Sequence, residues 1–260
     1  MRRKAICVVT AVGATALAGG AVAGTTLTYE TPDGATGMTY SITADRLSMD
    51  SPARDSTIIY DVAADRMTTV DHGERTYTVI TAETRAQMEK QISDAQRAQM
   101  QAMEDSVEHL PPEAREKILA ATKSGVSAGQ KGLSEGMKTR VNRTGRIETV
   151  NGYECEVIRL RVMMGSSEIC LASNAEVGMP AEAAAAMKKM SQGMRQLSGS
   201  IMRGLGSTMP GGPGLEGVAV RIRSGGETYV LSDLSTGSVD ASKFAVPDGY
   251  EEQELMTQGE

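Results

Sequence analysis

The sequence predicts an α+β protein built on one mostly antiparallel sheet. Strand-like segments fall into two blocks, and a long stretch of helix-forming residues separates them. Within the blocks, turn residues recur about every ten residues, which is typical of an antiparallel meander. The chain has neither a parallel β-α-β rhythm nor a Gly-rich phosphate loop. These observations exclude a doubly wound nucleotide-binding fold.

The first block contains five expected strands. They are β-branched or partly alternating segments bounded by turn residues such as Pro32-Asp33-Gly34, Ser51-Pro52 and His72-Gly73. We expect strands at residues 25–30, 38–49, 56–62, 66–71 and 75–81.

A helical insertion is expected at residues 82–138. Residues 84–109 contain no Gly or Pro and are rich in Ala, Gln, Glu, Met and Arg, which favour a helix that Thr81 or Thr84 could cap. A narrow apolar face follows Met88, Ile92, Ala95, Gln99, Met103 and Val107. Pro111-Pro112 ends this helix, a second helix is expected at 113–123, and four Gly residues in 124–136 indicate a loop or weak helix.

The second block contains strands at 139–150, 153–163 and 167–172, and a hairpin of 217–223 with 227–236 around Gly225-Gly226. Between them, a helix is expected at 181–205, with Pro180 at its start. Apolar residues at spacings of three and four give this helix one apolar stripe: Met187, Met190, Met194, Leu197, Ile201 and Leu205.

The N-terminus has the pattern of a secretory signal peptide. Arg2, Arg3 and Lys4 precede a short apolar stretch that ends in small residues at Ala21-Val22-Ala23. We expect a signal peptide at 1–23, a single domain at 24–250 and an acidic, frayed tail at 251–260. The expected location is the periplasm, and no later segment is apolar enough to span a membrane.

Composition excludes some classes of partner. The formal net charge is −6, and loss of the three basic leader residues would make it −9. Without a basic cluster in the sequence, the chain is a poor candidate for nucleic acid or anionic lipid surfaces. The sequence contains no Trp, one Phe and 17 Met. Flexible Met side chains are therefore expected to fill much of the core. The oligomeric state stays open.

Two cysteines, Cys155 and Cys170, lie outside the predicted leader. An exported compartment and an even number favour a disulfide. A hairpin turning near Gly165 would place them about five positions out of register, whereas a bridge needs Cα atoms within about 7 Å. The pair is therefore expected as a disulfide, with two buried free thiols as the alternative.

No catalytic constellation is recognisable, so the chain is predicted not to be an enzyme. The two His residues, His72 in a turn and His109 near a helix end, are interpreted as polar surface. Zinc-ligand spacings are absent, and we expect no cofactor or metal. One minor alternative is copper binding by thioethers, which suit Cu(I), at Met187, Met190 and Met194 with Met100 and Met103.

Three segments resemble an uncharacterised family of exported bacterial proteins. They are Ile59-Tyr60-Asp61 through Tyr77, Gly152-Tyr153-Glu154-Cys155 with Glu168-Ile169-Cys170, and Phe244-Ala245-Val246-Pro247-Asp248-Gly249-Tyr250. That family looks related to the periplasmic lipoprotein-carrier (LolA-like) superfamily. The resemblance implies an incomplete antiparallel β-barrel, a half-barrel with helical insertions covering one face. Phe244 and Pro247 would belong to a final edge strand, and the two cysteines would match the family's pair.

The resulting hypothesis is a non-enzymatic periplasmic binding or carrier protein for an apolar ligand, an envelope lipoprotein or a lipid. Helix 181–205 would cover the concave face, with Met187, Met190, Met194 and Leu197 as ligand contacts. The alternative is a structural or interaction protein of the cell envelope without a small ligand, with insertion 82–138 as its contact surface.

Overall fold

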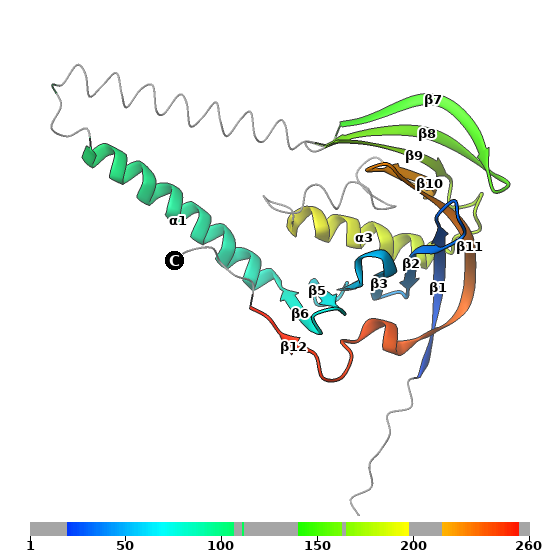
Figure 1. The fold of residues 1–260 in the computed structure, drawn as a ribbon, viewed down its shortest axis with the longest axis horizontal. Coiled ribbons are helices and arrows are strands. Elements are labelled where there is room, and N and C mark those ends of the chain that lie inside the picture. The colour runs from blue at the N-terminus through cyan, green and yellow to red at the C-terminus, as the bar shows by residue number, and fades with distance from the viewer. Residues whose placement is uncertain (1–19, 107–110, 112–139, 163–164, 198–214, 255–260) are drawn as a thin grey trace, which may run out of the picture.

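The computed structural model describes residues 20–106, 111, 140–162, 165–197 and 215–254. These residues form one 12-stranded sheet, mixed but largely antiparallel and open, together with two helices (Figure 1). The expected mostly antiparallel sheet in two blocks is confirmed. The strand order is β12-β6-β5-β4-β3-β2-β1-β11-β10-β9-β8-β7.

The first block is a meander of six neighbouring strands. It comprises β1 (Ala21–Glu30), β2 (Thr36–Ile42), β3 (Arg46–Ser51), β4 (Ser56–Asp61), β5 (Arg66–Asp71) and β6 (Thr76–Ile80), with a short 3-10 turn, η1, at Pro52–Arg54. The second block comprises β7 (Arg140–Val150), β8 (Tyr153–Val162), β9 (Gly165–Ala172), β10 (Val218–Ser224) and β11 (Glu227–Asp240). The helices are α1 (Ala82–Ser106) and α3 (Ala181–Leu197).

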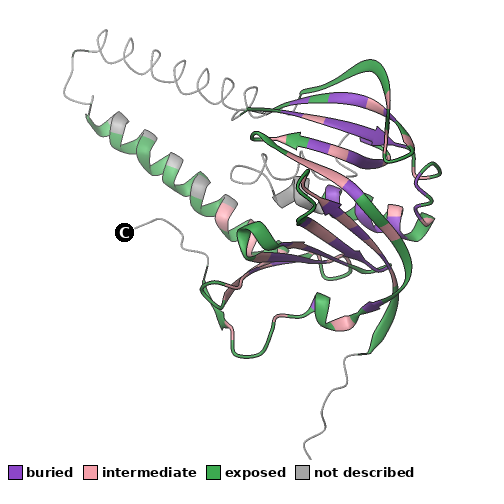
Figure 2. Cartoon of the chain, turned by 45° about the vertical axis from the view of Figure 1, so that its right-hand side comes forward, coloured by how far each residue is buried: buried purple, intermediate pink, exposed green. Residues whose placement is uncertain are grey.

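The two blocks join through the long antiparallel pairing of β1 with β11, from Ala21 opposite Asp240 to Glu30 opposite Val230. The sheet curves, so that its concave face looks onto α3 (Figures 1 and 2). β1 also includes Ala21–Ala23, which the sequence assigns to the end of the leader. Cleavage before Gly24 would therefore remove the first three pairs of this junction.

The expected single strand at 38–49 is wrong, because a tight turn divides it into β2 and β3. The Thr43 hydroxyl donates to the Asp45 carboxylate over 2.9 Å, and the Arg46 amide donates back to Thr43 Oγ1 over 3.0 Å. Thr43 is buried, so these local hydrogen bonds satisfy its hydroxyl at the reversal. Side chain–backbone bonds of this kind stabilise turns that carry no Gly or Pro.

Helix α1 begins where the sequence predicts. The Thr84 amide donates to Thr81 Oγ1 over 3.1 Å, which confirms Thr81 as the cap. Beyond Met88, every described side chain of α1 is exposed, including Ala95 and Gln99 of the expected apolar face (Figure 2). The expected helix at 113–123 and loop at 124–136 lie outside the described residues.

The start of α1 is fastened to the sheet by Asp65, in the turn between β4 and β5. Its carboxylate accepts hydrogen bonds from Tyr60, over 2.7 Å, and from Arg85, with which it also forms an ion pair. Desolvation raises the pKa of Asp65, but the hydrogen bonds from Arg85 and Tyr60 outweigh it and leave the pKa below its usual value. The carboxylate therefore stays charged and holds the first turn of α1 against the sheet.

The chain ends in a segment that crosses the convex face of the first block. We call residues 241–252 the C-terminal strap; it contains a 3-10 turn, η2 (Ala241–Phe244), and strand β12 (Glu251–Glu252), which pairs in parallel with β6. Phe244 is buried in η2 and not in an edge strand as expected. A small second core forms beneath the strap from Ile59, Val70, Val239 and Phe244, with Tyr77, Val246 and Tyr250 packed around it.

Candidate functional site

Helix α3 lies against the concave face and packs on β2 and β3. Its described buried apolar residues Ala183, Ala186, Met187 and Met190 follow the spacing of one helical stripe. Met187 is 3% exposed and Met190 is fully buried. Both therefore face the sheet, as the sequence predicts. The side chains of Met194 and Leu197 lie outside the described residues, as do positions 198–205 of the expected helix.

The concave face is a continuous apolar surface that draws on both strand blocks. Its members are all buried and belong to one core cluster with α3. From the first block they include Leu27, Tyr29, Tyr40, Ile42, Leu47, Met49, Ile58, Tyr60 and Met67, and from the second Ile158, Leu160, Ile169, Leu171, Val220, Ile222 and Leu231.

One polar atom in this surface has no partner. The Tyr29 side chain is fully buried, and its hydroxyl forms no hydrogen bond within the described part of the chain. The Tyr29 and Tyr40 rings meet edge to face with centroids 5.7 Å apart. Burial, with a smaller effect of Tyr40, raises the pKa of Tyr29 well above its usual value, so the hydroxyl keeps its proton. A buried donor of this kind is costly unless something accepts its hydrogen bond.

The apolar surface reaches the open edge of the sheet at β7. Val141 lies opposite Leu160 and Ile147 opposite Glu156, so both belong to the face of β8 that looks onto the concave side. They are 36% and 57% exposed. The Arg143–Glu156 ion pair lies on the same face between them. Exposed apolar side chains on an edge strand often mark a contact with another molecule.

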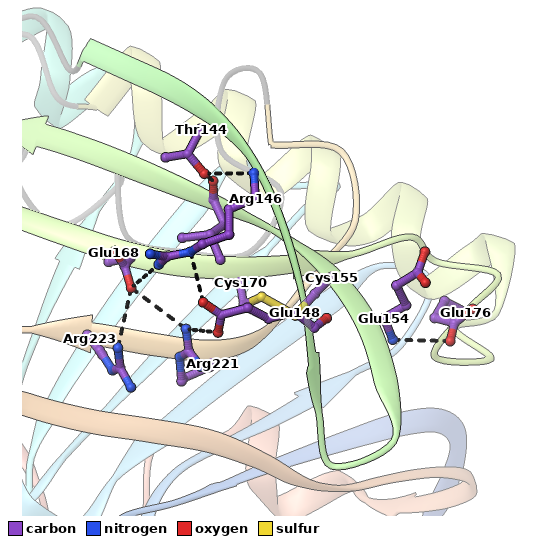
Figure 3. The surroundings of a disulfide bond; sticks show 11 residues. Thr144, Arg146, Glu148, Glu154, Cys155, Glu168, Cys170, Glu176, Arg221 and Arg223 are labelled. Atoms are coloured by element: carbon purple, nitrogen blue, oxygen red, sulfur yellow. Dashed lines mark hydrogen bonds and ion pairs between the residues drawn. A yellow bond between two sulfur atoms is a disulfide. The ribbon is translucent and has the colours of Figure 1, made fainter.

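Cys155 and Cys170 form a disulfide, with Cα atoms 5.3 Å apart (Figure 3). The expected register was wrong in one respect. The chain reverses between Val162 and Gly165, so Cys170 lies opposite Val157 and only two positions from Cys155. Because residues two apart share a face of a strand, the cysteines are diagonal neighbours on one face, and no bulge is needed between β8 and β9.

Arginine and glutamate side chains cover this disulfide on the convex face of the second block (Figure 3). Glu148 on β7 forms ion pairs with Arg146 over 2.9 Å and with Arg221 over 2.7 Å. The Arg221 guanidinium beside Glu148 lowers the pKa of that carboxyl. Glu168 on β9 lies within 4 Å of the guanidinium groups of Arg146, Arg159, Arg221 and Arg223.

A chain of hydrogen bonds ties the strap to the first block. The Thr57 hydroxyl donates to Asp50 over 2.6 Å and lies 2.8 Å from His72 Nε2, and His72 Nδ1 lies 2.9 Å from the Tyr250 hydroxyl. His72, interpreted from the sequence as polar surface, therefore bridges β4 and the strap. These contacts form a structural link between Thr57 of β4, His72 and Tyr250 of the strap.

Described residues line three of the protein's cavities. Two flank the strap, with volumes of about 550 and 770 Å³. The third, about 330 Å³, lies at the β10–β11 turn beside Arg159 and Arg223. None of the three is lined by α3. Within the described residues, no three His, Cys, Asp or Glu side chains gather as a metal site.

One known protein family matches the part of the chain that contains the second block. The sequence profile of DUF4412, a domain of unknown function, matches residues 105–250, which is more than half of the chain. The chain belongs to the DUF4412 family. The DUF4412 region contains α3, the disulfide, the strap as far as Tyr250, and the ion pairs of Glu148 and Glu168 with arginines, which we call the Arg–Glu network. Strands β1 to β6 precede it.

Other comparisons are distant. No curated protein matches. Two solved structures of PNGF-II, in the C2 and P21 space groups, superpose with TM-scores of 0.40 at 9% and 8% identity. They cover 90% and 91% of this chain, which spans about a third of their length (31% and 32%). None of the described helices is both long and apolar enough to cross a bilayer.

Proposed function

We propose that this DUF4412 protein is a non-enzymatic binding or carrier protein of the periplasm, holding an apolar ligand, a lipid or a lipid-modified protein segment, on the concave face beneath α3. The observation that carries the proposal is the unpaired Tyr29 hydroxyl inside an otherwise apolar surface. A ligand with one polar head and an apolar body would accept that hydrogen bond and fill the surrounding surface.

Helix α3 supports this proposal as a movable cover. Met187 and Met190 are flexible and polarizable, and such side chains repack around varied apolar shapes. The exposed Val141 and Ile147 lie on the edge strand β7. A ligand could enter beneath α3 from this edge. The resemblance to LolA-like carriers, with their half-barrel and helical cover, agrees with this arrangement. By the sequence spacing, the proposed ligand contacts also include Met194 and Leu197, whose side chains lie outside the described residues.

The Tyr29→Phe variant tests the proposal. Removing an unpaired buried hydroxyl should leave the free energy of unfolding unchanged or raise it by about 1 kcal/mol. If the hydroxyl serves a ligand, affinity for palmitic acid and dioleoyl phosphatidylcholine should fall about tenfold. Organic extraction first removes bound lipid from the purified protein, and native mass spectrometry then measures the adducts with each added lipid. Urea unfolding measures stability.

Tyr77→Phe is the matched control, because the Tyr77 hydroxyl bonds Glu252 on the opposite face of the sheet. It should leave lipid adducts unchanged. A wild-type protein that takes up neither lipid would contradict the carrier function. Equal affinities for wild type and Tyr29→Phe would remove Tyr29 from the site.

A second function, an envelope interaction protein, is favoured by one observation. Helix α1 projects away from the sheet, and beyond Met88 its described side chains are all exposed (Figures 1 and 2). Replacing residues 82–138 by a short Gly/Ser linker should then leave a folded protein that loses a discrete formaldehyde cross-link formed in cells by the full-length chain. Unchanged cross-linking would argue against this function, whereas lipid uptake by the shortened protein would agree with the carrier function.

A further inference from the structure

The convex face of the second block gathers arginines that lie far apart in the sequence. We call the following six residues the arginine patch: Arg140 and Arg146 on β7, Arg159 and Arg161 on β8, and Arg221 and Arg223 on β10. Strand register places them on one face. Arg140 lies opposite Arg161, Arg159 opposite Glu168, and Glu168 opposite Arg223. Directly opposed residues share a face, as do alternate residues of one strand.

Within the described residues, the carboxylates that form ion pairs with the patch are Glu148 and Glu168. Glu168 is shared by four guanidinium groups, at 3.2 Å from Arg146, 3.4 Å from Arg223, 3.5 Å from Arg159 and 3.7 Å from Arg221. Glu148 pairs with Arg146 and Arg221, which Glu168 already contacts. Two of the six arginines, Arg140 and Arg161, pair with neither carboxylate, in a protein whose net charge is −6.

The most exposed arginines of the patch have the fewest carboxylate partners. Arg140 and Arg161 are both exposed and directly opposed, and neither forms an ion pair with any residue that the structure describes. Like charges directly opposite each other on neighbouring strands destabilise a sheet, unless an anion lies between them. Arg159 and Arg223, with side chains 61% and 52% exposed, continue the patch to the 330 Å³ cavity at Gly225-Gly226. Glu227 lies at the rim of that cavity, and its carboxylate accepts a hydrogen bond from the Tyr229 hydroxyl.

Phosphate is the ligand chemistry that this patch fits. Guanidinium groups bind phosphate oxygens in bidentate fashion and keep their charge at any physiological pH. An array of such groups on one face of a sheet matches the repeated charges of an anionic membrane surface. The other face of the same strands carries the apolar surface that ends at Ile147.

We propose that the arginine patch docks the protein on an anionic phospholipid surface through the lipid phosphates. The inference rests on the proposed carrier function, because docking would bring the apolar edge at β7 to the membrane that supplies the ligand. It also differs from the expectation drawn from the sequence, which shows no basic cluster and therefore predicts poor binding to anionic lipid surfaces.

Vesicle co-sedimentation tests the inference. The full-length mature protein should bind mixed phosphatidylcholine–phosphatidylglycerol vesicles, more weakly as salt rises, and should not bind pure phosphatidylcholine vesicles. The triple variant Arg140→Gln/Arg159→Gln/Arg161→Gln should bind the mixed vesicles at least about tenfold more weakly. The control Arg66→Gln/Arg97→Gln/Lys188→Gln removes the same charge from exposed positions elsewhere and should bind like the wild type.

Several outcomes would overturn the docking inference. These are equal loss in both triple variants, equal binding to the two kinds of vesicle, or binding of inorganic phosphate in solution by a protein that does not bind the mixed vesicles, which would indicate a site for free phosphate. Binding to double-stranded DNA that is as strong and as dependent on the patch would indicate nucleic acid instead.

Lipid adducts measured without vesicles separate the two proposals. The patch variant should keep its palmitic acid adducts. A wild type that takes up lipid but ignores anionic vesicles would overturn the docking alone. A wild type that binds anionic vesicles through the patch but takes up no lipid would overturn the carrier function alone.

Discussion

Replacing both Cys155 and Cys170 with alanine is expected to lower the free energy of unfolding by about 3 kcal/mol. The bridge closes a loop with a sequence separation of 15, and its main effect is to restrict the unfolded chain. Both cysteines are buried, at 2% and 0% exposure, beneath the Arg–Glu network. Urea unfolding of the oxidised protein and of the double variant measures the difference.

Dithiothreitol provides the control for this prediction. It should destabilise the wild type by a similar amount and leave the double variant unchanged. A wild type that is indifferent to the reductant, or a double variant as stable as the oxidised protein, would contradict a stabilising disulfide at this position.

The second large effect is expected at Met190, which is fully buried between α3 and the sheet. Met190→Ala should lower the free energy of unfolding by about 2–5 kcal/mol, because it removes buried methylenes and the thioether and leaves a cavity. Met190→Leu keeps most of the volume and should cost less than about 1.5 kcal/mol. Chemical unfolding of the ligand-free protein checks both values.

Lys189→Ala is the matched control, since Lys189 is exposed on the same turn of α3. It should change stability by less than about 0.5 kcal/mol. If Met190→Ala cost as little as Lys189→Ala, α3 would not be packed on the sheet in the absence of ligand. Such a result would mean that α3 covers the concave face only when a ligand is present.

Much of the fold could be predicted from local features. Turn residues and β-branched segments located most strands to within a few residues, and Thr81 was correctly expected as the cap of α1. The turn at Thr43 was missed because it contains neither Gly nor Pro and is held by side-chain hydrogen bonds. The disulfide was expected from compartment and cysteine count. Its diagonal geometry depends on a hairpin register that turn residues define only to within a few positions.

The candidate site was only partly visible in the sequence. The stripe containing Met187 and Met190 follows from helical spacing, and the structure buries both. The unpaired hydroxyl of Tyr29 could not be foreseen, because every neighbour in the core decides whether a buried polar group has a hydrogen-bond partner. The role of His72 was missed for a related reason, since its partner Tyr250 lies 178 residues further along the chain.

The sequence by itself determined the alternation of strands and helices, the acidic balance, the Met-filled apolar stripe and the pair of cysteines. These properties depend on residue type and short-range spacing. Only the tertiary structure decided that β1 joins β11, that the strap covers the convex face, and that six arginines from three strands share one surface. Such features arise from pairing between distant segments, where hydrogen bonds and burial depend on the whole sheet and leave no local signature in the chain.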